Sequence, residues 1–217
     1  MMISFSGIDC SGKSTQIGIL RSRIEARDQR VIIIWSRGGY TPGIELIKRI
    51  ISPHRTKDKQ KMIQQSKAIC ASKRKSFILL FVSILDLWFY YGLIMHLQKH
   101  FYDVIICDRY IWDTYIDFKL KYPQHSFEEW FIWKMLLKLY AKPDISILLH
   151  IPPEISMNRS KLKNDPFPEK IDERRNRLNM YMKAEQERLW QYKIDATSSV
   201  EDVSYQISSI IESFVYK

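Results

Sequence analysis

Cysteine, glycine and proline are scarce in this sequence, and their scarcity excludes several classes of protein. The three cysteines among 217 residues, Cys10, Cys70 and Cys107, are too few and too widely spaced for a disulfide framework or a zinc site. Seven glycines and eight prolines beside 46% hydrophobic residues exclude a collagen-like, low-complexity or disordered chain. The first residues lack a charged, signal-like segment, so we expect a cytoplasmic protein. The length predicts a single domain over residues 1–217.

The formal charge of +10 is concentrated in one part of the chain. The segment Lys48–Lys75 holds ten Lys or Arg residues against one acid, Asp58, so the rest of the chain is close to neutral. A general nucleic-acid binder would spread its positive charge more evenly, and we expect no specific nucleic-acid partner. The segment therefore faces either one anionic partner or solvent.

Short apolar segments alternate with segments of helical length. The former predict strands buried on both faces, which are typical of a parallel sheet covered by helices: Met2–Ser6, Val31–Trp35, Val104–Cys107, Ile145–Ile151 and Tyr192–Asp195. The latter predict helices: Ser14–Asp28, Ser126–Ala141, Glu169–Trp190 and Val200–Val215. The alternation predicts an α/β fold, a three-layer α/β/α sandwich around a five-stranded parallel sheet.

The segment Phe77–Leu97 allows a different interpretation, because its 21 mostly apolar residues are long enough to span a bilayer. Asp86, near its middle, would make insertion into a membrane costly. In a chain that otherwise has an α/β pattern, we favour a helix packed against the sheet and expect no transmembrane span.

Residues 7–14, Gly-Ile-Asp-Cys-Ser-Gly-Lys-Ser, match the phosphate-binding loop (P-loop) pattern G-x-x-x-x-G-K-[ST] in full. A predicted strand precedes them and a predicted helix follows, so that backbone N–H groups and the helix dipole would face the phosphates of ATP. Lys13 would reach the β- and γ-phosphates, and Ser14 would bind Mg²⁺. We assign ATP binding to Gly7, Ser11, Gly12, Lys13, Ser14 and Thr15. The chain lacks a base-reading Asn-Lys-x-Asp motif, which favours a small-molecule kinase over a GTPase.

A second acid lies at the end of the predicted strand Val104–Cys107. Asp108 follows this strand, and its carboxylate would face the P-loop and help to hold Mg²⁺. Arg109 would lie where an acceptor phosphate meets the donor. The alternative is an ion pair at the end of the strand without a catalytic role.

Together these motifs resemble the thymidylate kinase family of P-loop nucleoside monophosphate kinases, over nearly the whole chain. The resemblance is carried by segments in the family's order: Ser6–Thr15, Arg37–Gly43, Leu79–Phe81, Asp108–Tyr110, Lys142–Asp144, Pro152–Glu154 and Ile194–Thr197. It implies the P-loop kinase fold, ATP and Mg²⁺ as cofactors, a small phosphorylated acceptor, and a possible homodimer.

The resemblance also implies roles on the acceptor side. Arg37 and Arg109 would grip the acceptor phosphate, and Asp9 would meet the acceptor sugar. Phe81 would stack on the base. A surface position for Arg37 and a core position for Phe81 are the alternatives.

On the donor side, Asp195 and Ala196 would lie beside the adenine of ATP. The basic segment at about residues 158–175 resembles a lid that closes over the phosphates and excludes water. The P-loop has no arginine of its own between Asp9 and Gly12, and in this family such loops accompany catalytic arginines in the lid. We assign that role to Arg159, with Arg174 or Arg175 as the alternatives, and catalysis to Lys13, Arg109 and Arg159.

The resemblance is weakest at the residues that would bind the nucleobase of the acceptor. The family follows the stacking aromatic residue with an arginine that reads the thymine edge, and here Leu85 or Leu87 stands in its place. Asp86 and Asp113 could supply polar contacts to an acceptor. A site without its hydrogen-bonding partner discriminates poorly, so the donor half of the reaction is better supported than thymine recognition.

We therefore expect ATP- and Mg²⁺-dependent phosphoryl transfer to a nucleoside monophosphate, dTMP by resemblance. A related kinase acting on another nucleotide, a nucleoside or a pathway-specific metabolite is the first alternative. The second alternative is an ATP-binding module that docks on an anionic partner through Lys48–Lys75, which predicts salt-dependent binding.

Overall fold

The computed structural model describes residues 1–35, 72–162, 169–186 and 188–215. Two compact units make up the chain. The first contains Met1–Trp35, Lys99–Ile116 and Lys142–Lys217, and the second contains Ser36–Gln98 and Asp117–Ala141. That the two act as the single domain 1–217 stays a prediction.

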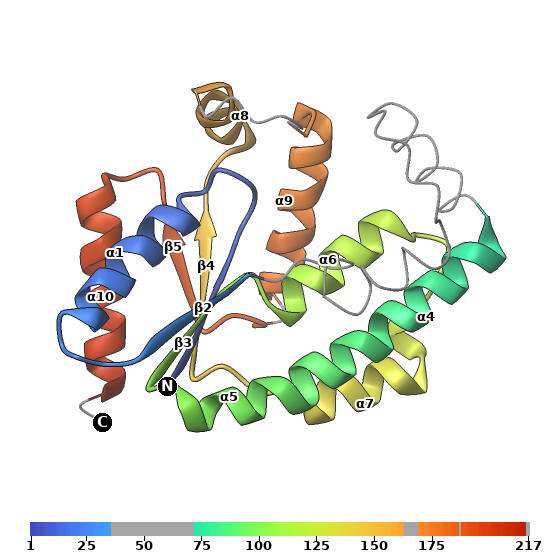
Figure 1. Cartoon of the computed structure of the whole chain (residues 1–217). Helices are drawn as coiled ribbons and strands as arrows, with labels where there is room; N and C mark the ends of the chain where they lie inside the picture. Colours follow the sequence, from blue (N-terminus) through green and yellow to red (C-terminus); the bar gives the residue numbers. More distant parts are fainter. Residues whose placement is uncertain (36–71, 163–168, 187, 216–217) are drawn as a thin grey trace, which may run out of the picture. The chain divides into compact units, whose positions relative to one another are not determined.

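The first unit contains a five-stranded sheet in which every strand is parallel (Figure 1). The strands, in the order β2-β3-β1-β4-β5 across the sheet, are β1 (Met2–Ser6), β2 (Val31–Trp35), β3 (Val104–Asp108), β4 (Ile145–His150) and β5 (Tyr192–Asp195). The side chains of β1, β3 and β4 are almost all buried, because helices cover the sheet on both faces. The loop that follows β1 lies between the ends of β3 and β4, where the strand order reverses and such sheets bind their ligands.

The described part of the first unit also contains four helices that lie wholly within it: α1 (Lys13–Glu25), α8 (Pro153–Leu162), α9 (Ile171–Gln186) and α10 (Val200–Val215). Figure 1 shows α1 and α10 side by side on one face of the sheet and α9 on the other. Gln16 joins the first two helices, since its Nε2 donates to the carbonyl oxygen of Val200 at 2.9 Å. The predicted α/β class and parallel sheet are therefore confirmed.

The second unit is helical in its described part. Helix α4 (Lys73–Phe89), the π-helical turn η1 (Tyr90–Ile94) and the start of α5 (Met95–Phe101) form one continuous rod, which packs on α7 (Phe131–Leu139). The remaining elements are the end of α6 (Ile111–Lys121), which begins in the first unit, and the 3₁₀ turn η2 (Phe127–Glu129). Edge-to-face aromatic contacts between Phe118, Phe127 and Trp133 form its core.

Among the described residues, one helix, Lys73–Phe101, is long and apolar enough to cross a membrane, and it is the apolar rod of the second unit. Of its most apolar stretch of 18 residues, 28% is buried. The buried positions recur along one side of the rod, at Leu80, Ile84, Leu87, Tyr91 and Met95. This periodic burial is the pattern of a helix that packs on neighbouring protein segments.

Predicted elements and observed elements differ mainly at helix ends. The helix predicted over Ser126–Ala141 is divided, because Trp130 adopts an extended conformation between η2 and α7. The helix predicted over Glu169–Trp190 ends at Gln186, and Arg188 beyond it has a left-handed φ of 56°. The strands start at the predicted residues and differ from the predicted ends by one residue at most.

Candidate active site

The P-loop connects β1 to α1, and its backbone requires glycine at two places. Gly7 has a φ of 141°, and a Cβ atom there would clash with the carbonyl oxygen of Leu149 on β4. Gly12 caps the N-terminus of α1 with a φ of 92°. Cys10, between them, adopts a left-handed φ of 59°, which is strained for a residue with a side chain. The loop is thus held in one curled conformation at the positive end of α1.

Lys13 is folded back over the P-loop rather than extended from it. Its Nζ donates hydrogen bonds to the carbonyl oxygens of Gly7 at 2.9 Å and Ile8 at 2.8 Å, and to Ser11 Oγ at 3.2 Å. Burial, and then the nearby charge of Arg109, lower the pKa of Lys13 to about 7. The Lys13 amino group therefore lies within the curl of the loop, where phosphate oxygens would bind. It also binds its proton less tightly than an exposed lysine does.

Ser14 and Asp108 bring two oxygen ligands together beside the P-loop. Ser14 Oγ lies 3.5 Å from Asp108 Oδ2 at the end of β3. The other carboxylate oxygen, Asp108 Oδ1, is buried and forms no hydrogen bond within the described residues. Mg²⁺ takes oxygen ligands, and this pair offers a hydroxyl oxygen and a carboxylate oxygen that forms no other hydrogen bond in the described part of the chain. These residues are therefore suited to binding the ion. Both were predicted as metal-binding residues.

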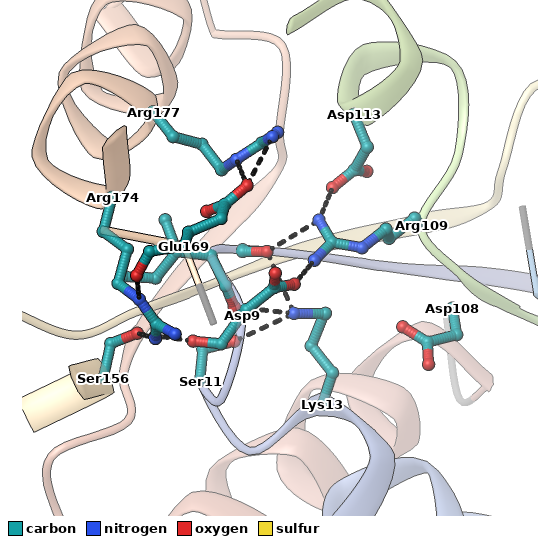
Figure 2. A network of polar contacts seen from close by, with 12 residues as sticks. Asp9, Ser11, Lys13, Asp108, Arg109, Asp113, Ser156, Glu169, Arg174 and Arg177 are labelled. Carbon is teal, nitrogen blue, oxygen red and sulfur yellow. Dashed lines mark hydrogen bonds and ion pairs between the residues drawn. The ribbon is translucent and has the colours of Figure 1, made fainter. Parts of the chain in front are cut away.

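Arg109 is the centre of a buried polar network, which Figure 2 shows from close by. Its Nη1 donates to the carbonyl oxygen of Gly7 at 3.0 Å and to Tyr181 Oη at 3.2 Å, and its Nη2 pairs with the carboxylate of Asp9. Asp113 Oδ1 lies 3.5 Å from Nη1. Arg109 has a left-handed φ of 73°, a strained conformation that such a network can hold in place. The two sequence-predicted acceptor residues Asp9 and Arg109 therefore lie in contact.

The side chain of Asp113 is wholly buried and belongs to this network. Besides Arg109, its carboxylate accepts hydrogen bonds from Ser6 Oγ, from the backbone N–H of Tyr110 at 3.0 Å and from Tyr181 Oη. Its carboxylate thus contacts Arg109 and three other protein donors, and a direct contact with an acceptor stays a prediction. Tyr181 was missed by the sequence analysis, because on α9 its spacing resembles that of an ordinary core residue.

The predicted adenine-side residues lie at the end of β5. The backbone N–H of Ala196 donates to the carbonyl oxygen of His150, and the carboxylate of Asp195 accepts a hydrogen bond from the backbone N–H of Thr197. The latter bond lowers the pKa of Asp195. Arg159 links this turn to the P-loop: its Nη2 donates to the carbonyl oxygen of Ala196 at 3.0 Å and its Nη1 lies 3.5 Å from that of Cys10.

The lid arginines have unlike surroundings. Arg175 is exposed and lies near Glu154 and Asp172, whereas Arg174 is fully buried. Residues 163–168, in the middle of the predicted lid, lie outside the described residues. The catalytic role assigned to Arg159 stays a prediction, and its observed partners are backbone oxygens of the P-loop and of the adenine-side turn.

Other predicted residues are not brought into this network. Thr15 is exposed on α1. Phe81 lies in the second unit, on α4, where it is 37% exposed and stacked on Phe77 with ring centroids 6.2 Å apart. Arg37 and most of the basic segment Lys48–Lys75 lie outside the described residues, and its last three members, Lys73, Arg74 and Lys75, are exposed.

Comparison with known proteins gives a consistent match over most of the chain. The family model described as thymidylate kinase matches residues 5–207. A thymidylate kinase of Thermosipho africanus is 28% identical over 220 residues, which cover 98% of each chain. A thymidylate kinase of Caldicellulosiruptor saccharolyticus is 24% identical over 99% of this chain and 97% of its own. A probable thymidylate kinase of Thermococcus kodakarensis is 29% identical over 99% and 98%.

Proposed function

The chain belongs to the thymidylate kinase family, and we propose on that premise that it transfers the γ-phosphoryl group of ATP to the phosphate of a nucleoside monophosphate, with Mg²⁺ as cofactor. One observation carries the proposal: Lys13 and Arg109 converge on the carbonyl oxygen of Gly7. The P-loop lysine would contact the donor phosphates, and the arginine would contact the acceptor phosphate. Their shared partner supports phosphoryl transfer between two phosphates at this position.

Catalysis at such a site depends on positioning and charge. The terminal phosphoryl group carries negative charge over its oxygens in the transition state, which Lys13 and Arg109 would stabilise from opposite sides. Their hydrogen bonds to the P-loop backbone hold both side chains near this position before the substrates arrive, and on binding they would exchange part of these bonds for bonds to phosphate oxygens. Bound Mg²⁺, held by Ser14 and Asp108, would neutralise part of the phosphate charge.

The acceptor in this proposal is itself a phosphate, which is already ionised at neutral pH. No strong general base is therefore required, and none is proposed. Asp9 would release Arg109 in part when the acceptor phosphate arrives, because both anions would compete for the same guanidinium edge.

The family points to dTMP as the acceptor. One observation instead favours a broader acceptor specificity, or a different nucleoside monophosphate. Leu85 lies one helical turn beyond Phe81 on the exposed side of α4 and is 43% exposed, whereas Leu87 is fully buried. Of the two positions that could correspond to the thymine-reading arginine, Leu85 therefore shares the side that carries Phe81. An apolar side chain there supports an acceptor whose base is held by stacking more than by hydrogen bonds.

The proposal is tested by the products of the reaction. The full chain is incubated with ATP, Mg²⁺ and each of a panel of nucleoside monophosphates, and mass spectrometry follows the corresponding diphosphate. A diphosphate of any panel member supports the proposal, and the rate order identifies the acceptor. A cytoplasmic location and a homodimer remain proposals that accompany it.

A further inference from the structure

Arg174 is a buried charged residue of the first unit that the proposed mechanism does not use. Its side chain lies on α9 with no solvent exposure, and among the described residues it forms no ion pair. Its neighbour Glu169 gives its carboxylate to Arg177 instead, at 2.9 Å from Nη2. Burying a guanidinium among neutral groups is costly in free energy unless hydrogen bonds compensate. The hydrogen bonds of Arg174 therefore indicate its role.

Each contact of Arg174 is made to a neutral oxygen. Nε donates to the carbonyl oxygen of Glu169 at 3.1 Å, Nη2 donates to Ser160 Oγ at 2.9 Å, and Nη1 donates to Ser156 Oγ. Both serines lie on α8 and are buried. Arg174 therefore joins α9 to α8 through two hydroxyl groups of one helix face.

Of the two serines, Ser156 reaches the P-loop. Its Oγ lies 2.7 Å from the carbonyl oxygen of Asp9 (Figure 2). Because a guanidinium can only donate, the hydroxyl accepts from Arg174 and its single proton is directed to Asp9. Within the described residues Ser160 has no such bond to the loop.

The Asp9 carbonyl controls the next N–H group. The peptide bond between Asp9 and Cys10 is trans and planar, so fixing the carbonyl oxygen on one side fixes the Cys10 N–H on the other. Within the described residues this N–H has no acceptor, and the left-handed φ of Cys10 requires support from its surroundings. N–H groups of such a loop are the donors that bind phosphate.

We propose that Arg174 and Ser156 are positioning residues of the P-loop: the buried guanidinium orients the Ser156 hydroxyl, which fixes the Asp9–Cys10 peptide for binding the phosphates of a nucleoside triphosphate. The proposal rests on the proposed function, since it assigns these residues to the donor half of that reaction.

Ser156→Ala and Ser160→Ala provide the matched test, because each removes one buried hydroxyl that accepts from Arg174 and only Ser156 also contacts Asp9. The affinity for ATP is measured by calorimetry with Mg²⁺ present, beside thermal unfolding and the kinetic constants. We expect Ser156→Ala to weaken ATP binding and raise KM for ATP about tenfold, with kcat changed less than about twofold. Ser160→Ala should change ATP affinity less than about twofold, with a similar shift in unfolding temperature.

A double-mutant cycle separates a relay from independent contacts. Arg174→Met should weaken ATP binding about as much as Ser156→Ala, and the double variant should be no weaker than either, because both act through one hydroxyl. Lys183→Met, which removes an exposed positive charge from α9, is the control. Equal effects of the two serine variants, or a fall in kcat with unchanged ATP affinity, would overturn the proposal. A wild-type protein that binds no ATP would instead overturn the proposed function.

Discussion

Lys13 and Arg109 donate hydrogen bonds to the same atom, the carbonyl oxygen of Gly7, over 2.9 Å and 3.0 Å. Two cations held this closely repel one another, and the arrangement persists because Asp9, Asp108 and the loop carbonyl oppose the repulsion. The negative charge of phosphates bound beside the two cations would relieve this repulsion further. The first three predictions below follow from this cluster.

The lowered pKa of Lys13 makes part of the stability pH-dependent. Unfolding restores the ordinary value of 10.5, so between about pH 7 and 10.5 the folded chain binds fewer protons than the unfolded chain. The contribution of Lys13 to the free energy of unfolding therefore rises with pH in this window. The free energies of unfolding of wild type and Lys13→Met are measured with urea at pH 7 and pH 9.5. Relative to Lys13→Met, wild type should be more stable at pH 9.5 than at pH 7. A difference independent of pH would contradict the prediction.

Asp108→Asn should raise the Mg²⁺ requirement. The amide keeps the size of the side chain and loses the negative charge that would hold the ion, so the Mg²⁺ concentration for half-maximal activity should rise about tenfold or more. Calorimetry of ATP binding with and without Mg²⁺ gives a readout that is independent of turnover. Asp172→Asn, at an exposed position on α9, is the control and should match wild type. An unchanged Mg²⁺ dependence in Asp108→Asn would remove this residue from the metal site.

Arg109→Lys should separate the two halves of the reaction. Lysine keeps the charge but cannot reproduce the fork that reaches Gly7, Tyr181 and Asp9 together, so the acceptor should be held less well. We expect KM for the acceptor to rise about tenfold or more and the affinity for ATP to change less than about threefold. Steady-state kinetics in each substrate check this, with Arg21→Lys at an exposed position on α1 as the control. Loss of ATP affinity alone would place Arg109 on the donor side.

Leu85→Arg tests the reading of the acceptor base. If the exposed side of α4 that carries Phe81 contacts the base, an arginine at this position should raise the preference for dTMP over other monophosphates about tenfold, since a charged hydrogen bond is gained with one base edge. The ratio of kcat/KM values across the panel measures it. Leu85→Met keeps the apolar character and should leave the ratio as in wild type. A ratio unchanged by the arginine would remove Leu85 from the acceptor site.

The fold and the P-loop were predictable because their signals are local. Five apolar segments predicted the strands to within one residue, and the spacing of Gly7, Gly12 and Lys13 predicted the loop between β1 and α1. The contact of Ser14 with Asp108 followed from the rule that the ends of parallel strands meet at one edge of the sheet.

The supports of the site were not predictable, because they join residues far apart in the sequence. Tyr181 reaches Arg109 across 72 positions, and Ser156 reaches Asp9 across 147. Neither bond has a local pattern, since each depends on how α8 and α9 pack on the P-loop. The full burial of Arg174, which was predicted only as an alternative to Arg159 among the lid arginines, was not predictable for the same reason.

The central claim is phosphoryl transfer from ATP to a nucleoside monophosphate at the cluster of Lys13 and Arg109. The most direct measurement is the rate of ADP formation by wild type and by Lys13→Ala, with Mg²⁺ and ATP, in the presence and absence of each monophosphate of a panel. We predict that at least one monophosphate stimulates ADP formation by wild type and that Lys13→Ala abolishes the stimulation. Wild-type turnover no greater than that of Lys13→Ala with every acceptor would contradict the claim.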